Sequence, residues 1–279
     1  GDAEADVSAS GEVPVPGTGL TLPAQLTGSV EIDVESYVHI FALTHVFEKK
    51  VLGGNAGLAV MVPYVNADLD VSGDGVLTLT GPGGMISFDI PVSGESDTSD
   101  NGIGDMSFTG LLGWHRERLH YLAILNVYAP TGEYDEDQAL NVGKNHWAIE
   151  PMGAVTYLNE KTGLELSGAA GITFNMENKD TEYTSGEEFH LDLAAIQHFS
   201  EYFYLGLVGY VYHQLSGDSG DGASDDFKGR VYAWGPVIGG AIPLGEKRNL
   251  FVNARYYDEF DAKNRLEGNA FYLTGVVNF

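Results

Sequence analysis

The chain has 279 residues, with 14 lysines and arginines against 40 aspartates and glutamates, so its formal net charge is −26. So acidic a chain repels nucleic-acid phosphates, and no basic cluster offsets the repulsion, so we expect no nucleic-acid partner. The absence of cysteine excludes disulfide frameworks, thiolate metal sites and cysteine nucleophiles. Apolar residues make up 43% of the chain, which separates it from a disordered acidic tail.

The sequence contains no run of about 18 apolar residues, so no transmembrane helix is expected. Its first residues, Gly1-Asp2-Ala3-Glu4, lack the charged start and apolar core of a secretory signal, which is typical of a processed, mature chain. A membrane location stays open, because a closed β-barrel crosses the bilayer with alternating segments of about ten residues.

Apolar and polar residues alternate with a period of two along most of the chain, which predicts strands. From Leu20 to Val38, for example, the even positions are mostly apolar. The alternating segments are, in chain order, 22–47, 54–68, 103–115, 119–130, 146–158, 164–177, 187–199, 202–214, 228–242, 249–260 and 266–279.

Residues 164–177 show the alternation most clearly. Leu164, Leu166 and Ile172 fall on one side of the expected strand, and Glu165 and Thr173 fall on the other. Successive side chains of a strand point to opposite faces, so one face is apolar and the other is small and polar. We therefore expect the even residues of 164–176 to face lipid.

The connections between these segments alternate between short and long. The short ones are 116–118, 159–163, 200–201 and 243–249, and the long ones are 69–102, 131–145, 178–186 and 215–227. Short periplasmic turns and long extracellular loops are typical of an all-β, transmembrane, antiparallel up-and-down barrel, here of about twelve strands in the bacterial outer membrane. A soluble lipocalin-like barrel shares this pattern only in part.

The end of the chain also fits an outer-membrane barrel. Phe271, Leu273, Gly275, Val277 and the terminal Phe279 fall on one face. Such a C-terminal strand is what the barrel assembly machinery reads, although an ordinary edge strand gives the same pattern. Aromatic residues near strand ends suit girdles at the two membrane interfaces or ordinary strand packing; they are Tyr37, Phe47, Tyr64, Trp114, Tyr128, Trp147, Tyr157, Phe174, Tyr202, Phe203, Tyr212 and Trp234.

The N-terminal segment 1–21 raises a counting problem, because bacterial single-chain barrels normally have an even number of strands. Three alternatives remain: a twelfth strand within 1–21, a segment that runs through the lumen, or a chain that lacks its first strand. Residues 22–279 are expected to form one barrel domain.

Several short stretches combine glycine, proline and aromatic residues near strand ends. They are Lys50-Val51-Leu52-Gly53-Gly54, Val62-Pro63-Tyr64-Val65-Asn66, Gly102-Ile103-Gly104-Asp105, Leu112-Gly113-Trp114-His115, Leu119-His120, Ala129-Pro130-Thr131-Gly132-Glu133-Tyr134, Asn141-Val142-Gly143-Lys144-Asn145-His146-Trp147, Glu150-Pro151 and 178–190. Over roughly residues 36–279 the chain resembles the outer-membrane channel family of the meta-pathway of phenol degradation. The resemblance implies a monomeric barrel of about twelve strands that passes bulky, fairly apolar small molecules by diffusion. The family usually has a strand before 22–47, which favours the missing-strand alternative.

Polar residues of the strands are the candidates for the lumen, because water or loops fill it. Glu188, His190 and Asp192 share one face of 187–199, with Glu150 and Glu165 as partners on other strands. Histidine and carboxylates spaced two apart could chelate a divalent metal, but a hydrogen-bonded network is the simpler interpretation, so we expect no metal and no cofactor.

The few basic residues on strands are candidates as well. Arg230 and Arg255 are expected to line the interior, the latter beside Glu259, because a cation that faces lipid is penalised. Each arginine is expected to pair with a facing carboxylate and so either to brace the wall or to narrow the pore.

The glycine- and aspartate-rich stretches are interpreted as loops. Gly81-Pro82-Gly83-Gly84 is not followed by Lys-Ser/Thr or by a helix, so a phosphate loop is not expected. Asp218, Asp221, Asp225 and Asp226 could weakly bind Ca²⁺, but a solvated acidic loop is the favoured interpretation. Loop 69–102 is long enough to fold inward as a plug.

The sequence therefore predicts a passive channel for small, hydrophobic or amphipathic organic molecules, including aromatic ones. The acidic balance disfavours anionic solutes, provided that the charge reaches the pore. The expected partners are these solutes, outer-membrane lipid and lipopolysaccharide, and the assembly machinery through Phe279. An outer-membrane hydrolase or acyltransferase and a structural or adhesin barrel are the alternatives, although no Gly-x-Ser-x-Gly elbow occurs.

Overall fold

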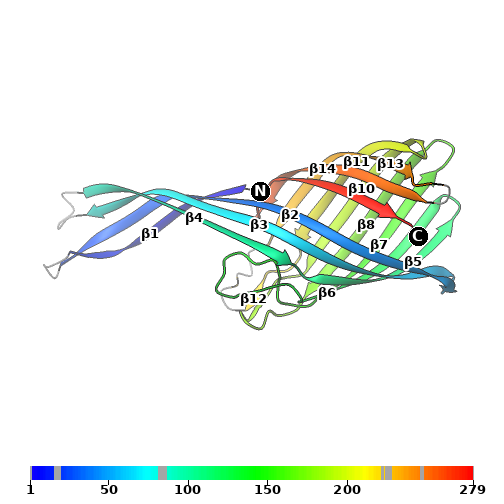
Figure 1. Ribbon diagram of the computed structural model, residues 1–279. Coiled ribbons are helices and arrows are strands. Elements are labelled where there is room, and N and C mark those ends of the chain that lie inside the picture. The colour runs from blue at the N-terminus through cyan, green and yellow to red at the C-terminus, as the bar shows by residue number, and fades with distance from the viewer. Residues whose placement is uncertain are drawn as a thin grey trace. The chain divides into compact units, whose positions relative to one another are not determined.

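The computed structural model describes residues 2–15, 20–80, 87–220, 223, 228–245 and 248–278, and all regular secondary structure in these ranges is β. Among these residues, no helix is long and apolar enough to cross a membrane. The strands are β1 (Asp2–Val15), β2 (Leu20–Val51), β3 (Gly54–Thr80), β4 (Ser87–Ile103), β5 (Met106–Arg116), β6 (Leu119–Ala129), β7 (Ala148–Asn159), β8 (Leu164–Asn175), β9 (Tyr183–Thr184), β10 (Glu188–Ser200), β11 (Phe203–Gln214), β12 (Ser219–Gly220), β13 (Arg230–Pro243), β14 (Asn249–Lys263) and β15 (Asn269–Val277). Figure 1 shows them in chain order by colour.

The chain divides into two compact units. The first comprises Gly1–Tyr37 and Asn66–Asp100, and the second comprises Val38–Val65 and Asn101–Phe279. β2, β3 and β4 each contribute residues to both units, because the unit boundaries fall within these strands.

In the first unit, β1 pairs antiparallel with β2, from Asp2 opposite Asp33 to Val15 opposite Leu20. The expectation of a long loop over 69–102 is wrong, because β3 continues to Thr80 and β4 begins at Ser87. Thr78 Oγ1 donates a hydrogen bond of 2.8 Å to Asp89 Oδ1 between these two strands. Glycine, aspartate and serine suggested a loop there, but pairing with a neighbouring strand outweighs their weak strand propensity.

The first unit is also the most acidic part of the chain. Residues 1–37 contain seven aspartates and glutamates, residues 66–100 contain seven more, and neither range contains a lysine or arginine. These fourteen carboxylates exceed half of the net charge of −26. The net charge of the whole chain therefore does not describe the second unit.

The second unit is a curled antiparallel sheet in which each strand neighbours the next along the chain (Figure 1). Its strand order is β2-β3-β5-β6-β7-β8-β10-β11-β13-β14-β15. The expected segments from 103–115 to 266–279 coincide with β5 to β15 within a few residues at either end, apart from the two-residue strands β9 and β12, which pair with each other in the long loops. The prediction of an all-β, antiparallel, sequential sheet is confirmed.

The register separates the side chains of the second unit into two faces, because residues directly opposite each other on paired strands point the same way. Glu150, Thr173 and His190 lie on one face, which we call the polar face. The apolar face carries large hydrophobic side chains such as Leu207, Trp234 and Leu273, which are 54%, 57% and 69% exposed. So much exposed apolar surface requires an apolar surrounding.

The short connections turn through residues with positive φ, as tight hairpins require. Glu117 (φ 49°) lies between β5 and β6, Gly163 (φ 72°) precedes β8, and Gly245 (φ 95°) follows β13. A Cβ added to Gly163 would lie 2.1 Å from the His198 carbonyl oxygen, which is a steric clash. This turn therefore also packs against β10. Compact turns at this end of the sheet keep neighbouring strands in register.

Two glycines in strands provide a test of the close packing within the sheet. A Cβ added to Gly235 on β13 would lie 1.9 Å from the carbonyl oxygen of Tyr256, whereas one added to Gly153 on β7 would meet nothing within 4 Å. We expect Gly235→Ala to lower the stability of the folded sheet by roughly 1–3 kcal/mol, the usual cost of overpacking, and Gly153→Ala to leave it unchanged. Thermal unfolding followed by far-ultraviolet circular dichroism in detergent measures both variants, and equal melting temperatures would contradict the described packing.

Candidate functional site

The polar face carries a buried carboxylate near the end of the sheet that bears the long loops. Glu150 on β7 is 6% exposed, and it accepts hydrogen bonds from Asn126 Nδ2 at 2.7 Å, Tyr128 OH at 2.8 Å and Thr173 Oγ1 at 3.2 Å. Thr109 extends the network, since its hydroxyl donates to Asn126 Oδ1 at 2.7 Å. Donors from β6 and β8 thus surround a carboxylate of β7, which is what makes its burial tolerable.

His190 on β10 joins this network from the other side. Its Nε2 lies 2.8 Å from Glu150 Oε1, and its Nδ1 lies 2.9 Å from Asp192 Oδ2. The imidazole therefore bridges two carboxylates, one on its own strand and one two strands away. Within the described part of the chain, no group of three or more histidine and acidic side chains could hold a metal ion.

A second cluster lies further around the polar face. Tyr212 OH on β11 donates to Glu188 Oε1 at 2.6 Å, and Tyr210 OH on the same strand donates to Glu259 on β14. Glu259 also accepts from the Gly268 backbone N–H at 3.0 Å, and Arg265 NH2 lies 3.6 Å from it. The carboxylates of this cluster are therefore held by donors from the protein itself.

Glu165 lies in a third cluster, at the end of the sheet that bears the short turns. His198 Nε2 is 2.8 Å from Glu165 Oε2, and Ser167 Oγ donates to Glu165 Oε1 at 3.0 Å. Thr156 Oγ1 and Ser167 Oγ are 2.9 Å apart. Hydroxyl groups and an imidazole thus line β7, β8 and β10 here.

The two arginines that the sequence suggested differ in position. Arg230 pairs in register with His213, on the face that bears Trp234 and Ile238, and its NH2 lies 3.1 Å from Asp261 Oδ1. It therefore belongs to the apolar face near a strand end, contrary to the expectation, because Val231 rather than Arg230 shares a face with Tyr212. Arg255 does lie on the polar face, opposite Val237 and Tyr272.

A cavity of about 320 Å³ lies at the end of the sheet that bears the long loops. Its lining includes Asp105, Lys144, His146, Thr173, Asn175 and Glu188. Thr173 contacts Glu150 directly, so the cavity adjoins the network around Glu150. This cavity and the network form the candidate site, a polar surface with a concave space at one end.

Asp105 holds the loops that border this cavity. Its Oδ1 accepts hydrogen bonds from the backbone N–H groups of Thr131 and Gly132 at 3.0 and 2.9 Å. Its Oδ2 accepts from the N–H of Lys144 at 2.7 Å. The sequence stretches around Gly104, Gly132 and Gly143 meet here: a Cβ on Gly132 would lie 2.7 Å from Gly143 Cα and 3.0 Å from the Gly104 carbonyl carbon. Three separate glycine-containing stretches therefore form one anchor.

Asp218 plays the same role for the loops around β9 and β12. Gly186 N–H donates to its Oδ1 at 2.9 Å, Gln214 Nε2 donates to the same oxygen at 2.6 Å, and Tyr183 OH donates to Oδ2. Burial and this bond to a carboxylate raise the pKa of Tyr183 to about 12. Asp218 is thus occupied by protein donors. Asp221, Asp225 and Asp226 lie outside the described residues.

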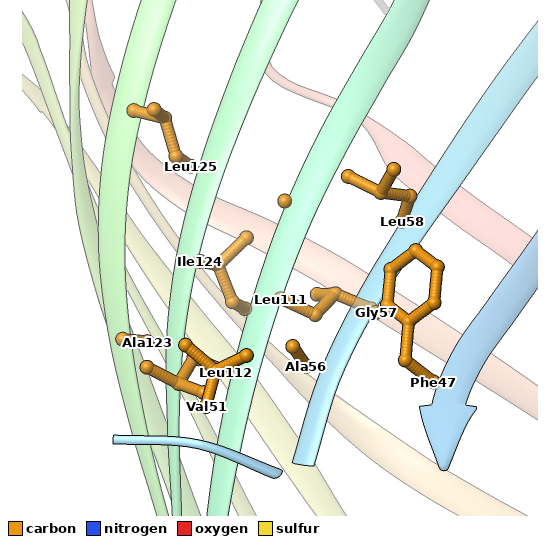
Figure 2. Close-up of a pocket in the computed structure, with 11 residues that line it drawn as sticks. Phe47, Val51, Ala56, Gly57, Leu58, Leu111, Leu112, Ala123, Ile124 and Leu125 are labelled. Carbon is orange, nitrogen blue, oxygen red and sulfur yellow. The ribbon is translucent and has the colours of Figure 1, made fainter. Parts of the chain in front are cut away.

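The apolar face carries an open groove of about 450 Å³ lined only by apolar residues (Figure 2). Leu58 and Leu125 stand on either side of Gly110, which pairs with both, and the missing side chain of Gly110 creates the groove. Figure 2 shows Phe47 and Val51 near its borders. The groove offers no side chain that could hydrogen-bond a polar ligand.

Comparison with protein-family models assigns the chain to a family. The family described as "Putative MetA-pathway of phenol degradation" matches residues 14–275. The chain belongs to this family. Comparison with curated proteins gives no match.

Among solved structures, this chain is similar to an outer membrane channel from Pseudomonas putida F1. The two chains share 17% sequence identity with a TM-score of 0.55, and the match covers 98% of this chain and 91% of that one. At this identity the likeness concerns the fold. It supports the arrangement of sequential antiparallel strands described above.

Sequence reasoning missed several members of the network. For Tyr128 and Tyr212 the sequence left interface girdle and ordinary strand packing open, but both lie on the polar face and donate to carboxylates. Asn126, Asp105 and Arg265 were not singled out for a role. The alternation of polar and apolar residues along β6 could have placed Tyr128 and Asn126 on the polar face. The roles of Asp105 and Arg265 depend on loops that only the fold brings together.

The Asp105 anchor can be tested by hydrogen exchange. Asp105→Ala removes the acceptor of three backbone N–H groups, so we expect faster exchange at Thr131, Gly132 and Lys144, by roughly 10- to 100-fold for the loss of hydrogen bonds to a charged group. Asp135→Ala is the matched control, since its carboxylate accepts from donors close by in the same loop, the Asp137 N–H at 3.1 Å and Gln138 Nε2 at 3.4 Å. Protection at Lys144 that survives in Asp105→Ala would refute the anchor.

Proposed function

We propose that the chain is an outer-membrane channel that passes small, hydrophobic or amphipathic organic molecules, including aromatic ones, by passive diffusion. The observation that carries this proposal is the division of one curled sheet into an exposed apolar face and a polar face with buried, hydrogen-bonded carboxylates. An apolar face of this kind suits lipid, and a polar face suits a water-filled lumen. The groove in Figure 2 suits an acyl chain rather than a polar solute.

Closure of the sheet is part of this proposal. β15 and β2 stand at the two ends of the eleven-strand order of the second unit and run in the same direction. We infer that one further strand joins their edges and completes an antiparallel barrel of about twelve strands. An open edge in hydrocarbon would leave backbone N–H and C=O groups unpaired, which costs several kcal/mol per group. The polar face then lines the lumen, with Glu150, Glu165, Glu188, His190, Asp192, Arg255 and Glu259 directed into it.

The cavity beside Asp105 is proposed as the entry to this lumen. It lies at the end with the long loops, which are extracellular in barrels of this type. Anchored loops keep the entry at a constant width, because the Asp105 bonds hold the loop backbones in place. Transport would follow the concentration gradient, and the protein would act as a monomer without a cofactor and without enzymatic turnover. Its other proposed partners are outer-membrane lipid, lipopolysaccharide and, through Phe279, the barrel assembly machinery; Phe279 lies outside the described residues.

Reconstitution of the purified protein into liposomes tests the function. We expect phenol to enter the vesicles faster than a hydrophilic solute of similar size, and protein-free liposomes provide the background rate. Turnover of an ester or phospholipid without solute flux would instead support an outer-membrane enzyme. The absence of both activities would support a structural or adhesin barrel.

The orientation of the faces can be tested on two neighbouring residues of β8. Ile172 pairs with Phe189 on the apolar face, and Thr173 lies on the polar face beside Glu150. We expect Ile172→Arg to impair assembly, because a cation that faces lipid near the midplane costs ~2–4 kcal/mol. Thr173→Arg should assemble, because its guanidinium meets a carboxylate. The heat-modifiable shift on a semi-native gel gives the folded fraction of each variant. Equal folded fractions of the two variants would contradict the assignment of Ile172 to the lipid face.

A further inference from the structure

Arg255 has an unusual environment on the polar face. It lies on β14 between Asn253 and Tyr257, and its register partners are Val237 on β13 and Tyr272 on β15. The guanidinium carbon is 5.8 Å from the centroid of the Tyr272 ring. The hydroxyl of Tyr257 is also within its hydrogen-bonding reach. None of these immediate neighbours is acidic.

Arg255 has no ion-pair partner among the residues that the structure describes, in contrast to the other arginines of this region. Arg230 lies 3.1 Å from Asp261, and Arg265 lies 3.6 Å from Glu259. The Nε atoms of Arg255 and Arg230 are both buried without a hydrogen-bond partner, and so is Oδ1 of Asn253. Arg230 differs from Arg255 in that its NH2 has a carboxylate partner. A partly buried guanidinium without an ion-pair partner is costly, so its position on the polar face points to a partner that the described residues do not supply.

The surface beside Arg255 is apolar and aromatic. Val208, Ala233, Val237 and Tyr257 form a buried cluster, against which Ile196, Tyr204 and Tyr210 pack. The ring of Tyr257 lies 5.1 Å from that of Tyr210 and 5.8 Å from that of Tyr272, centroid to centroid. A planar hydrocarbon ring can stack or make edge contacts with such tyrosines.

Among the described residues, none of the carboxylates nearby makes an ion pair with Arg255. Glu259 is held by Tyr210, Arg265 and the Gly268 N–H. Glu165 is held by His198 and Ser167. Asp192 is held by His190. In the described part of the chain, Arg255 therefore keeps an unpartnered Nε and no carboxylate partner, while the acidic groups around it already accept hydrogen bonds from other residues.

We propose that Arg255 and Tyr272, backed by the buried tyrosines of this wall, form a binding site for aromatic carboxylates, with the carboxylate on the guanidinium and the ring on Tyr272, which is 48% exposed. Arginine is suited to this role because its planar donors match the two oxygens of a carboxylate. This proposal rests on the proposed channel function and narrows its solute class. It also departs from the expectation that net charge disfavours anions, because at least fourteen of the carboxylates lie in the first unit.

Current measurements on single channels in planar bilayers test the site, with benzoate as the probe. We expect benzoate to interrupt the current with a half-saturating concentration that rises about 10- to 100-fold in Arg255→Gln, as for the loss of hydrogen bonds to a charged group. Arg255→Lys keeps the charge but loses the paired donors, and should fall between the wild type and Arg255→Gln. Arg230→Gln is the matched control: it removes an arginine from the other face and should leave benzoate binding unchanged.

Two further probes separate the parts of the ligand. Benzyl alcohol keeps the ring without the carboxylate, and cyclohexanecarboxylate keeps the carboxylate without the aromatic ring. We expect both to bind more weakly than benzoate, and only cyclohexanecarboxylate should respond to Arg255→Gln. Equal binding of benzoate and benzyl alcohol would show that the carboxylate contributes nothing to binding and would overturn the proposal. Equal binding of benzoate and cyclohexanecarboxylate would overturn the requirement for an aromatic ring.

The failure of this inference is distinguishable from the failure of the channel function. A wild-type protein that conducts, but whose benzoate response is the same in Arg255→Gln, Arg255→Lys and the wild type, would overturn the binding site and leave the channel intact. A folded protein that passes neither ions nor phenol would overturn the channel function itself. The heat-modifiable gel shift confirms folding of each variant; if Arg255→Gln does not fold, Arg255→Lys decides the result.

Discussion

The alternation of side chains along each strand is the constraint on which this structure depends. A strand must place successive residues on opposite faces, so one sequence has to satisfy two surroundings at once. In the second unit, this requirement puts leucine, tryptophan and phenylalanine on one face and glutamate, histidine and tyrosine on the other. A shift of the register by one residue would exchange the two sets, so the pattern also determines which strands can pair.

The polar face shows how a chain with so many carboxylates can keep several of them close together. Glu150 has donors from β6, β8 and β10, Glu188 has Tyr212, and Glu259 has Tyr210 and Arg265. Tyrosine and asparagine supply most of these donors, since basic residues are scarce. Hydrogen bonds that cross from strand to strand also brace the curled sheet, so the network has a structural role whatever passes along it.

The loops near the cavity depend on single buried or half-buried acidic residues rather than on a hydrophobic core. Asp105 accepts hydrogen bonds from three N–H groups at the two ends of the loop between β6 and β7. Asp218 accepts them from Tyr183, Gly186 and Gln214. A carboxylate can accept several hydrogen bonds at once, which makes it an efficient anchor for irregular backbone. The glycines at 104, 132 and 143 allow the backbones to approach closely enough for this arrangement.

The sequence by itself determined the class of fold, the order of the strands and the faces of most of them, because a period of two is a local property that each segment carries alone. It also determined Glu150, Glu188 and His190 as polar-face residues, by parity against an apolar opposite face. Only the tertiary structure decided that 69–102 forms strands, that Arg230 lies on the apolar face, and that Arg255 lacks a carboxylate partner. These features depend on which strands are neighbours and on the register between them. The alternation within one segment does not specify its pairing with a distant segment.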